Sequence, residues 1–152
     1  MLTMNEKDKN EMLEAILNEN EAYQCKLWAV IMAGADTYAL IGGLSTLTGG
    51  AAAALGALSN AYCYLGVTEQ HLNMVFVNSV NVSKIENRLS LPLSSITKAE
   101  VKGGILPGRK VVMLHFGKEK MKISLMNNAI GSDIQGQKEN VEMFCQIVSK
   151  LG

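Results

Sequence analysis

Apolar and polar residues alternate along much of the chain between residues 62 and 126, and turn-forming residues interrupt the alternation. The stretch YCYLGVTEQHLNMVFVNSV predicts two strands that turn near Glu69 and Gln70. IENRLSLPLSSI predicts another strand, with Pro92 at its end or on a sheet edge. KAEVKGGILPGRKVVMLHFGKEKMKISLM contains a glycine-rich corner and then two strands joined at residues 117–119. This pattern constrains the chain to a sheet that buries one face.

Helical patterns lie near both ends of the sequence. Asn5 can cap a helix over residues 5–18 that has one apolar face, and residues 21–33 predict a first strand. A closing helix is predicted by an apolar stripe at helical spacing, which consists of Val141, Phe144, Cys145, Val148 and Leu151. We therefore expect one mainly β domain over residues 1–152, a small barrel or sandwich closed by a C-terminal helix.

Four stretches resemble the bacterial pleckstrin-homology-like (PH/GRAM) family: LNENEAYQCKLWAV, YLGVTEQHLNMV, LSLPLSSITKAEV and the closing helix with Phe144. The resemblance covers about residues 19–33 and 62–151. It implies a seven-strand barrel-like sandwich capped by a C-terminal helix, working as a non-enzymatic binding or assembly module. Phosphoinositide-binding members place basic residues along and after the first strand, where this chain has only Lys26 nearby. The headgroup pocket of those relatives has no visible counterpart here.

An uncharged run extends from Thr37 to Thr68 and overlaps a Gly/Ala-rich insertion, residues 34–60, after the first strand. Its leucines follow helical order, and three glycines recur every seven residues, which would let another backbone approach closely. We expect two short helices, near residues 37–47 and 51–60, folded back at a Thr-Gly-Gly break. The candidate interaction surface consists of Leu40, Gly42, Leu44, Leu47, Gly49, Leu55, Gly56 and Leu58.

Three settings for this hairpin remain open on sequence grounds. It can pack on its own domain or pair with another subunit, it can dip into a membrane, or it can form a mobile loop. A full membrane span is disfavoured, because each leucine gains only about 0.3–0.6 kcal/mol on insertion and many glycines interrupt the run. A span would also separate the first strand from the rest of its sheet.

The formal net charge is zero, with 14 basic and 14 acidic residues, but residues 98–122 are rich in lysine. Such a segment is typical of a solvated face, and it also offers a contact for anionic lipid. It lacks interleaved exposed aromatic residues, so we expect no nucleic-acid partner. The candidate anion or lipid contacts are Lys98, Lys102, Arg109, Lys110, Lys118 and Lys120.

No catalytic, metal-ligating or cofactor-binding pattern is evident. His71 and His115 have no Cys, Asp or Glu at metal-ligand spacing, and structural or solvent-facing roles are expected for both. Cys25, Cys63 and Cys145 are scattered in apolar segments, which indicates small buried side chains. The N-terminus lacks a signal-peptide pattern, so a cytoplasmic protein, with membrane association as an option, is the expectation.

Two functional interpretations follow. The first is a non-enzymatic PH-like module that self-associates or binds a protein partner, through the hairpin or through an open sheet edge. The alternative is a peripheral membrane protein that uses the apolar residues 38–60 and the basic residues 98–122.

Overall fold

The computed structural model describes residues 4–32, 61–78, 80–103, 108–117, 119–127 and 132–151. The predicted hairpin, residues 34–60, and with it every residue of the candidate interaction surface, Leu40 to Leu58, lies outside the described residues. The described elements are α1 (Glu6–Ala15), β1 (Cys25–Met32), β2 (Ala61–Val67), β3 (His71–Val77), β4 (Ile85–Pro92), the 3₁₀ turn η2 (Leu93–Ser95), β5 (Lys98–Gly103), β6 (Arg109–Phe116), β7 (Glu119–Met126) and α3 (Gln137–Ser149).

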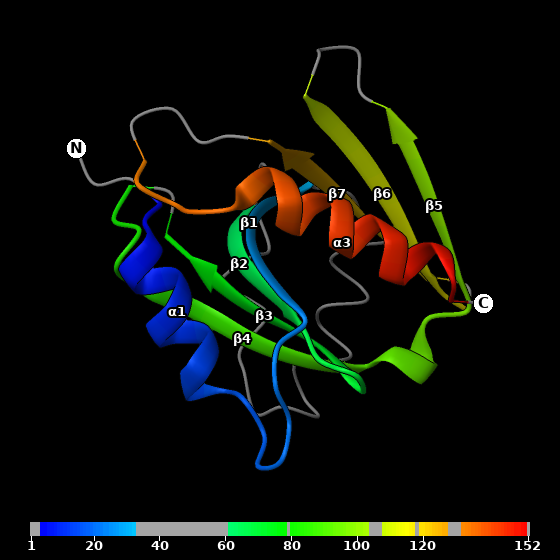
Figure 1. The fold of residues 1–152 in the computed structure, drawn as a ribbon, viewed down its shortest axis with the longest axis horizontal. Coiled ribbons are helices and arrows are strands. Elements are labelled where there is room, and N and C mark those ends of the chain that lie inside the picture. The colour runs from blue at the N-terminus through cyan, green and yellow to red at the C-terminus, as the bar shows by residue number, and fades with distance from the viewer. Residues whose placement is uncertain are drawn as a thin grey trace.

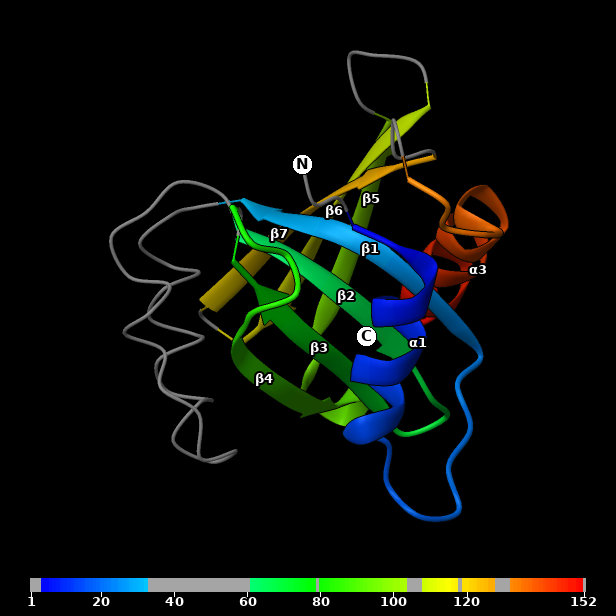
Figure 2. The same ribbon diagram turned by 90° about the vertical axis from the view of Figure 1, so that its left-hand side faces the viewer.

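Within this part of the chain, seven strands form one antiparallel sheet in the order β4-β3-β2-β1-β7-β6-β5 (Figure 1). The two halves meet where β1 pairs with β7, in a register that covers only Val30, Ile31 and Met32 of β1. Figure 2 shows that β1–β4 and β5–β7 run in clearly different directions on either side of this junction. The expected mainly β fold, with a helix near each end of the chain, is confirmed.

The main hydrophobic core lies between the inner face of the sheet and α3. Every second residue of β1 points into it, as the period-two pattern predicts. The predicted stripe of the closing helix is also confirmed, because Val141, Phe144, Cys145 and Val148 are buried in the same core and Leu151 packs against it. Full burial of a side chain as large as Phe144 stabilises the fold by about 1.5–3 kcal/mol, which explains how a single helix closes this side of the sheet.

Helix α1 covers the outer face of β1, β2 and β3. The side chain of Asn5 accepts a hydrogen bond from the Asp8 backbone N–H at 2.8 Å, so the predicted N-cap is confirmed. The helix is shorter than the predicted residues 5–18, because it ends at Ala15. Leu13 is buried against a second cluster that includes Trp28. The outer face of β1 around Trp28 and Val30 is therefore covered.

β7 pairs with only the last three residues of β1, and side chains of α3 bind the backbone of β1 before that point. The amide of Gln137 accepts a hydrogen bond from Trp28 N–H at 3.2 Å and donates to the carbonyl oxygens of Trp28 and Met126 at 2.9 and 3.0 Å. Two residues earlier on β1, the Lys26 N–H donates to the Asn140 side chain at 3.2 Å. The start of α3 thus satisfies backbone groups that a longer β7 would otherwise have bound.

Candidate anion-binding face

The outer surface of β5, β6 and β7 carries most of the predicted basic contacts. In the register of these strands, Lys98 lies opposite His115, and Lys102 lies opposite Val111. On the other side of β6, Met113 lies opposite Lys122. We call this surface the basic face; it consists of Lys98, Glu100, Lys102, Arg109, Val111, Met113, His115, Lys120, Lys122, Ser124 and Met126.

The strand register sorts the six sequence candidates. Lys98, Lys102, Arg109 and Lys120 share the basic face. Lys110 does not share the basic face: it lies opposite the buried Leu125, on the side of β6 that faces α3, because adjacent strand residues point to opposite faces.

Two further lysines differ from the sequence-based list in other ways. Lys118 lies outside the described residues. Lys122 was missed, although the Lys-x-Lys alternation in EKMKISLM places it on the same face as Lys120. The alternation of side chains along a strand therefore predicts that Lys122 belongs to the basic face.

The two described helices pack elsewhere. Helix α1 packs against β1, β2 and β3, and α3 packs on the inner side of the sheet (Figure 2). Helix α1 holds Glu6, Asp8, Glu11 and Glu14 of the acidic N-terminal segment, and its main contacts are with β1, β2 and β3. Within the described part of the chain, neither helix covers the outer surface of β5–β7.

The basic face has five cationic side chains and one carboxylate among the described residues. Glu100 Oε2 lies 2.9 Å from His115 Nε2, and Glu100 Oε1 lies 3.8 Å from Lys98 Nζ. The hydrogen bond with His115 and the charge of Lys98 hold the pKa of Glu100 below its usual value. The Glu100 carboxylate is thus engaged with His115 and Lys98 at one end of the face.

Arg109 is held in place by a buried partner. Its Nε donates to Ser124 Oγ at 2.9 Å, and Ser124 is only 5% exposed. In the described ranges, no carboxylate lies within ion-pair distance of Lys102, Arg109 or Lys122. These three cations are available to a ligand.

A hollow of about 350 Å³ opens among these cations. Its floor is apolar, formed by Val111 and Met113 of β6, and Met32 contributes from the end of β1. The full lining consists of Met32, Glu100, Lys102, Gly103, Arg109, Val111, Met113 and Lys122. The volume is at the lower end of the range of small-molecule sites.

A second, more acidic hollow of about 290 Å³ lies beside the turn between β2 and β3. It includes Glu21, whose Oε1 lies 2.7 Å from His71 Nδ1. Burial raises the pKa of Glu21, but hydrogen bonds from Thr68 and His71 outweigh it and leave the pKa below its usual value. This pair connects the loop after α1 to β3, so His71 has a structural contact.

The cysteines lie in the interior and are free thiols. Burial raises the pKa of Cys25 to about 12 and also raises the pKa values of Cys63 and Cys145. Thiols of this kind are poor nucleophiles because little thiolate is present near neutral pH.

Across the described residues, no group of three or more His, Cys, Asp or Glu side chains is arranged to hold a metal ion. No helix in those ranges has both the length and the apolar character needed to cross a membrane.

Comparison with known proteins supports the architecture. No protein-family model matches the sequence, and neither does any curated protein. The fold is that of a β-sandwich closed by a helix. It is similar to the hSac2 domain from human phosphoinositide phosphatase Sac2, with a TM-score of 0.52 and 10% sequence identity, over 91% of this chain and 74% of that chain. At this identity the similarity concerns the fold alone.

Proposed function

We propose that this protein is a non-enzymatic binding module of the PH-like type, and that its basic face attaches it to an anionic membrane surface. The observation that carries the proposal is the concentration of five cations on one sheet surface that neither described helix covers. Its other support is the resemblance of the sequence to PH/GRAM domains.

Electrostatic attraction favours anionic lipid headgroups as the partner of the basic face. Each Lys or Arg close to an anionic bilayer contributes about 1 kcal/mol, and this attraction falls off within about one Debye length. Lysines that share one sheet face can reach the headgroups together. The partly buried Val111 and Met113 lie between them and supply apolar contact at the same surface.

A non-enzymatic role fits the chemistry of the described side chains. His71 and His115 are each engaged with a glutamate, and the buried thiols have raised pKa values. Self-association or protein binding through residues 34–60 remains a separate prediction, since those residues lie outside the described ranges.

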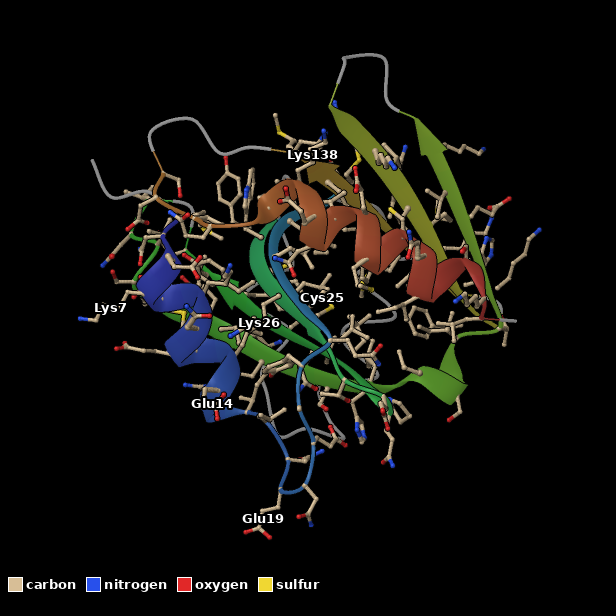
Figure 3. All side chains as sticks on the ribbon, viewed as in Figure 1. Lys7, Glu14, Glu19, Cys25, Lys26 and Lys138 are labelled. Carbon is tan, nitrogen blue, oxygen red and sulfur yellow. The ribbon has the colours of Figure 1, made fainter. Side chains whose placement is uncertain are left out.

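Co-flotation with phosphatidylcholine vesicles, with and without phosphatidylglycerol, tests the proposal. We expect binding only to the anionic vesicles, with a decrease as salt rises. The triple variant Lys98→Gln, Lys120→Gln, Lys122→Gln should lose most of this binding. A control triple variant, Lys7→Gln, Lys84→Gln, Lys138→Gln, removes the same charge from exposed sites on other surfaces, and Figure 3 shows Lys7 extending away from α1.

The control triple variant should co-float nearly as well as wild type. Absence of wild-type binding would overturn the membrane role, and so would equal losses in the two triple variants. In the second case, net charge rather than the basic face would be responsible.

A further inference from the structure

We propose that the hollow in the basic face is a binding site for an amphipathic monoanion, a molecule with one oxyanion head and an apolar body. The proposal extends the proposed function and rests on it for the source of the ligand, a lipid of the membrane surface. The hollow has cations on its walls, an apolar floor and a single carboxylate at one side.

The walls bring together one cation from each of three neighbouring strands: Lys102 from β5, Arg109 from β6 and Lys122 from β7. Lys102 lies opposite Val111 and Lys122 opposite Met113, while Arg109 precedes Val111 by two residues on the same face. Lys102 and Arg109 are therefore diagonal neighbours, and such pairs in an antiparallel sheet are about 7–8 Å apart, which long side chains can span. The charged ends of Lys102 and Arg109 can converge on one oxyanion. Lys122 is four residues along β7 from Met126, the partner of Arg109, and lines the hollow from the β7 side.

Arg109 is the best suited of the three to fix the head of the ligand. Its bond to the buried Ser124 uses Nε and holds the side chain in place, which leaves the terminal guanidinium nitrogens for an incoming oxyanion. A guanidinium that is already oriented loses less conformational entropy on binding than a free lysine does.

The floor explains why the ligand carries an apolar body. Val111, Met113 and Met32 are only partly buried, and their side chains line the hollow. Methionine adapts its shape to an apolar partner at little cost. An inorganic anion leaves this surface exposed to water, whereas an amphipathic ligand covers it.

Glu100 limits the charge of the ligand. It lines the hollow while its carboxylate binds His115 and lies near Lys98. A second negative group on the ligand would be close to this carboxylate and would be repelled. The site therefore favours a single negative charge over a polyanion.

The test is an NMR titration with dihexanoyl phosphatidylglycerol as a soluble monoanionic probe, kept below the concentration at which it forms micelles. Dihexanoyl phosphatidylcholine is the matched probe without net charge, and inorganic phosphate is the probe without an apolar body. We expect the tightest binding for phosphatidylglycerol, with the largest shifts at residues of the hollow.

Two double variants with the same charge change separate the hollow from the rest of the basic face. Lys102→Gln with Arg109→Gln should weaken phosphatidylglycerol binding roughly tenfold or more, because both remove charged hydrogen-bond donors. Lys98→Gln with Lys120→Gln, on the same face outside the hollow, should weaken it less than about threefold. Glu100→Gln should strengthen binding of inorganic phosphate.

Equal weakening by the two double variants would overturn the site, and so would equal affinity for the two lipid probes. Vesicle binding by wild type without probe binding in the hollow would also overturn the site, while the membrane role stands. Probe binding in the hollow without vesicle binding would keep the site, overturn the membrane role, and identify a free amphipathic anion as the ligand.

Discussion

Tyr23 lies directly against the backbone of Gly66. A Cβ atom added at Gly66 would be 2.5 Å from Tyr23 Cε1 and 2.7 Å from Cδ1, closer than real Cβ contacts. The ring has little freedom to move, because its hydroxyl donates to the Leu13 carbonyl oxygen and accepts from Asn73 Nδ2 at 3.1 Å. Because Gly66 has no side chain, the ring of Tyr23 fits against β2. From there, Tyr23 links the loop that follows α1 to Leu13 of α1 and to Asn73 of β3.

We predict that Gly66→Ala lowers the free energy of unfolding by about 1–3 kcal/mol, because the tyrosine or the strand has to shift. Urea denaturation followed by circular dichroism measures the change. Gly103→Ala is the matched control, since a Cβ atom there meets nothing within 4 Å. Similar losses in the two variants would contradict the role assigned to Tyr23.

The bridge formed by Gln137 between β1 and β7 leads to a second prediction. Gln137→Leu keeps a similar volume but leaves Trp28 N–H and two carbonyl oxygens without their partner. We expect a loss of about 1–3 kcal/mol in the free energy of unfolding. Gln146→Leu, at an exposed position of the same helix, should change stability far less. An unchanged unfolding midpoint for Gln137→Leu would show that the bridge is dispensable.

Acid should weaken the contact between Glu21 and His71. Because the folded-state pKa of Glu21 lies below its usual value of 4.5, the ionised carboxylate stabilises the fold above about pH 4.5. That contribution is lost as the pH falls through the lower, folded-state pKa. In urea titrations from pH 7 to acid, Glu21→Gln should show less of this decline than wild type. Glu19→Gln should behave as wild type, since Glu19 points into solvent at the tip of the same loop (Figure 3).

The three thiols should resist modification in the folded protein. Cys25, Cys63 and Cys145 are buried, and burial raises the pKa of Cys25 to about 12. With Ellman's reagent near pH 8, we expect slow labelling of the native chain and rapid labelling in urea. Fast native labelling of any one thiol would show that its part of the core opens readily. Single Cys→Ser variants would identify that thiol.

Adjacent residues of β6 provide a sharp test of the assigned faces. Arg109→Gln and Lys110→Gln each remove one positive charge, but only Arg109 lies on the basic face. We expect Arg109→Gln to weaken binding to phosphatidylglycerol vesicles more than Lys110→Gln does. A second readout is the thiol of Cys145. Burial raises its pKa, and the positive charge of Lys110 partly offsets that rise. Lys110→Gln removes the charge, so the pKa of Cys145 should rise further and the thiol should become even less reactive. Equal vesicle binding by the two variants would place the contact elsewhere.

Much of the architecture was predictable because the alternation of apolar residues is strong. The turn near Glu69, the place of Pro92 at a strand end or sheet edge, and the buried stripe around Phe144 all follow from local patterns. The structure confirms them, with Pro92 the last residue of the edge strand β4. The covered outer side of β1 was harder to predict. In sequence, Trp28 shares one side of its strand with the polar Gln24 and Lys26, and only the tertiary packing of α1 shows that Trp28 is buried.

The site was predicted only in part, because a count of basic residues ignores strand parity. Residues 98–122 form a basic block in sequence, yet the register turns Lys110 toward α3 and adds Lys122 to the basic face. The hollow depends on Met32, which is far from this block in sequence and reaches it only through the pairing of β1 with β7. No local pattern contains that information.

The position of Met32 has a practical consequence for engineering this chain. Met32 lines the hollow and is the last residue of β1, so the polypeptide leaves this strand at the rim of the basic face. A fluorescent tag or new terminus placed directly after Met32 would crowd the ligand. The exposed turn at Asn81, between β3 and β4, is the safer attachment point because its strands lie at the opposite edge of the sheet.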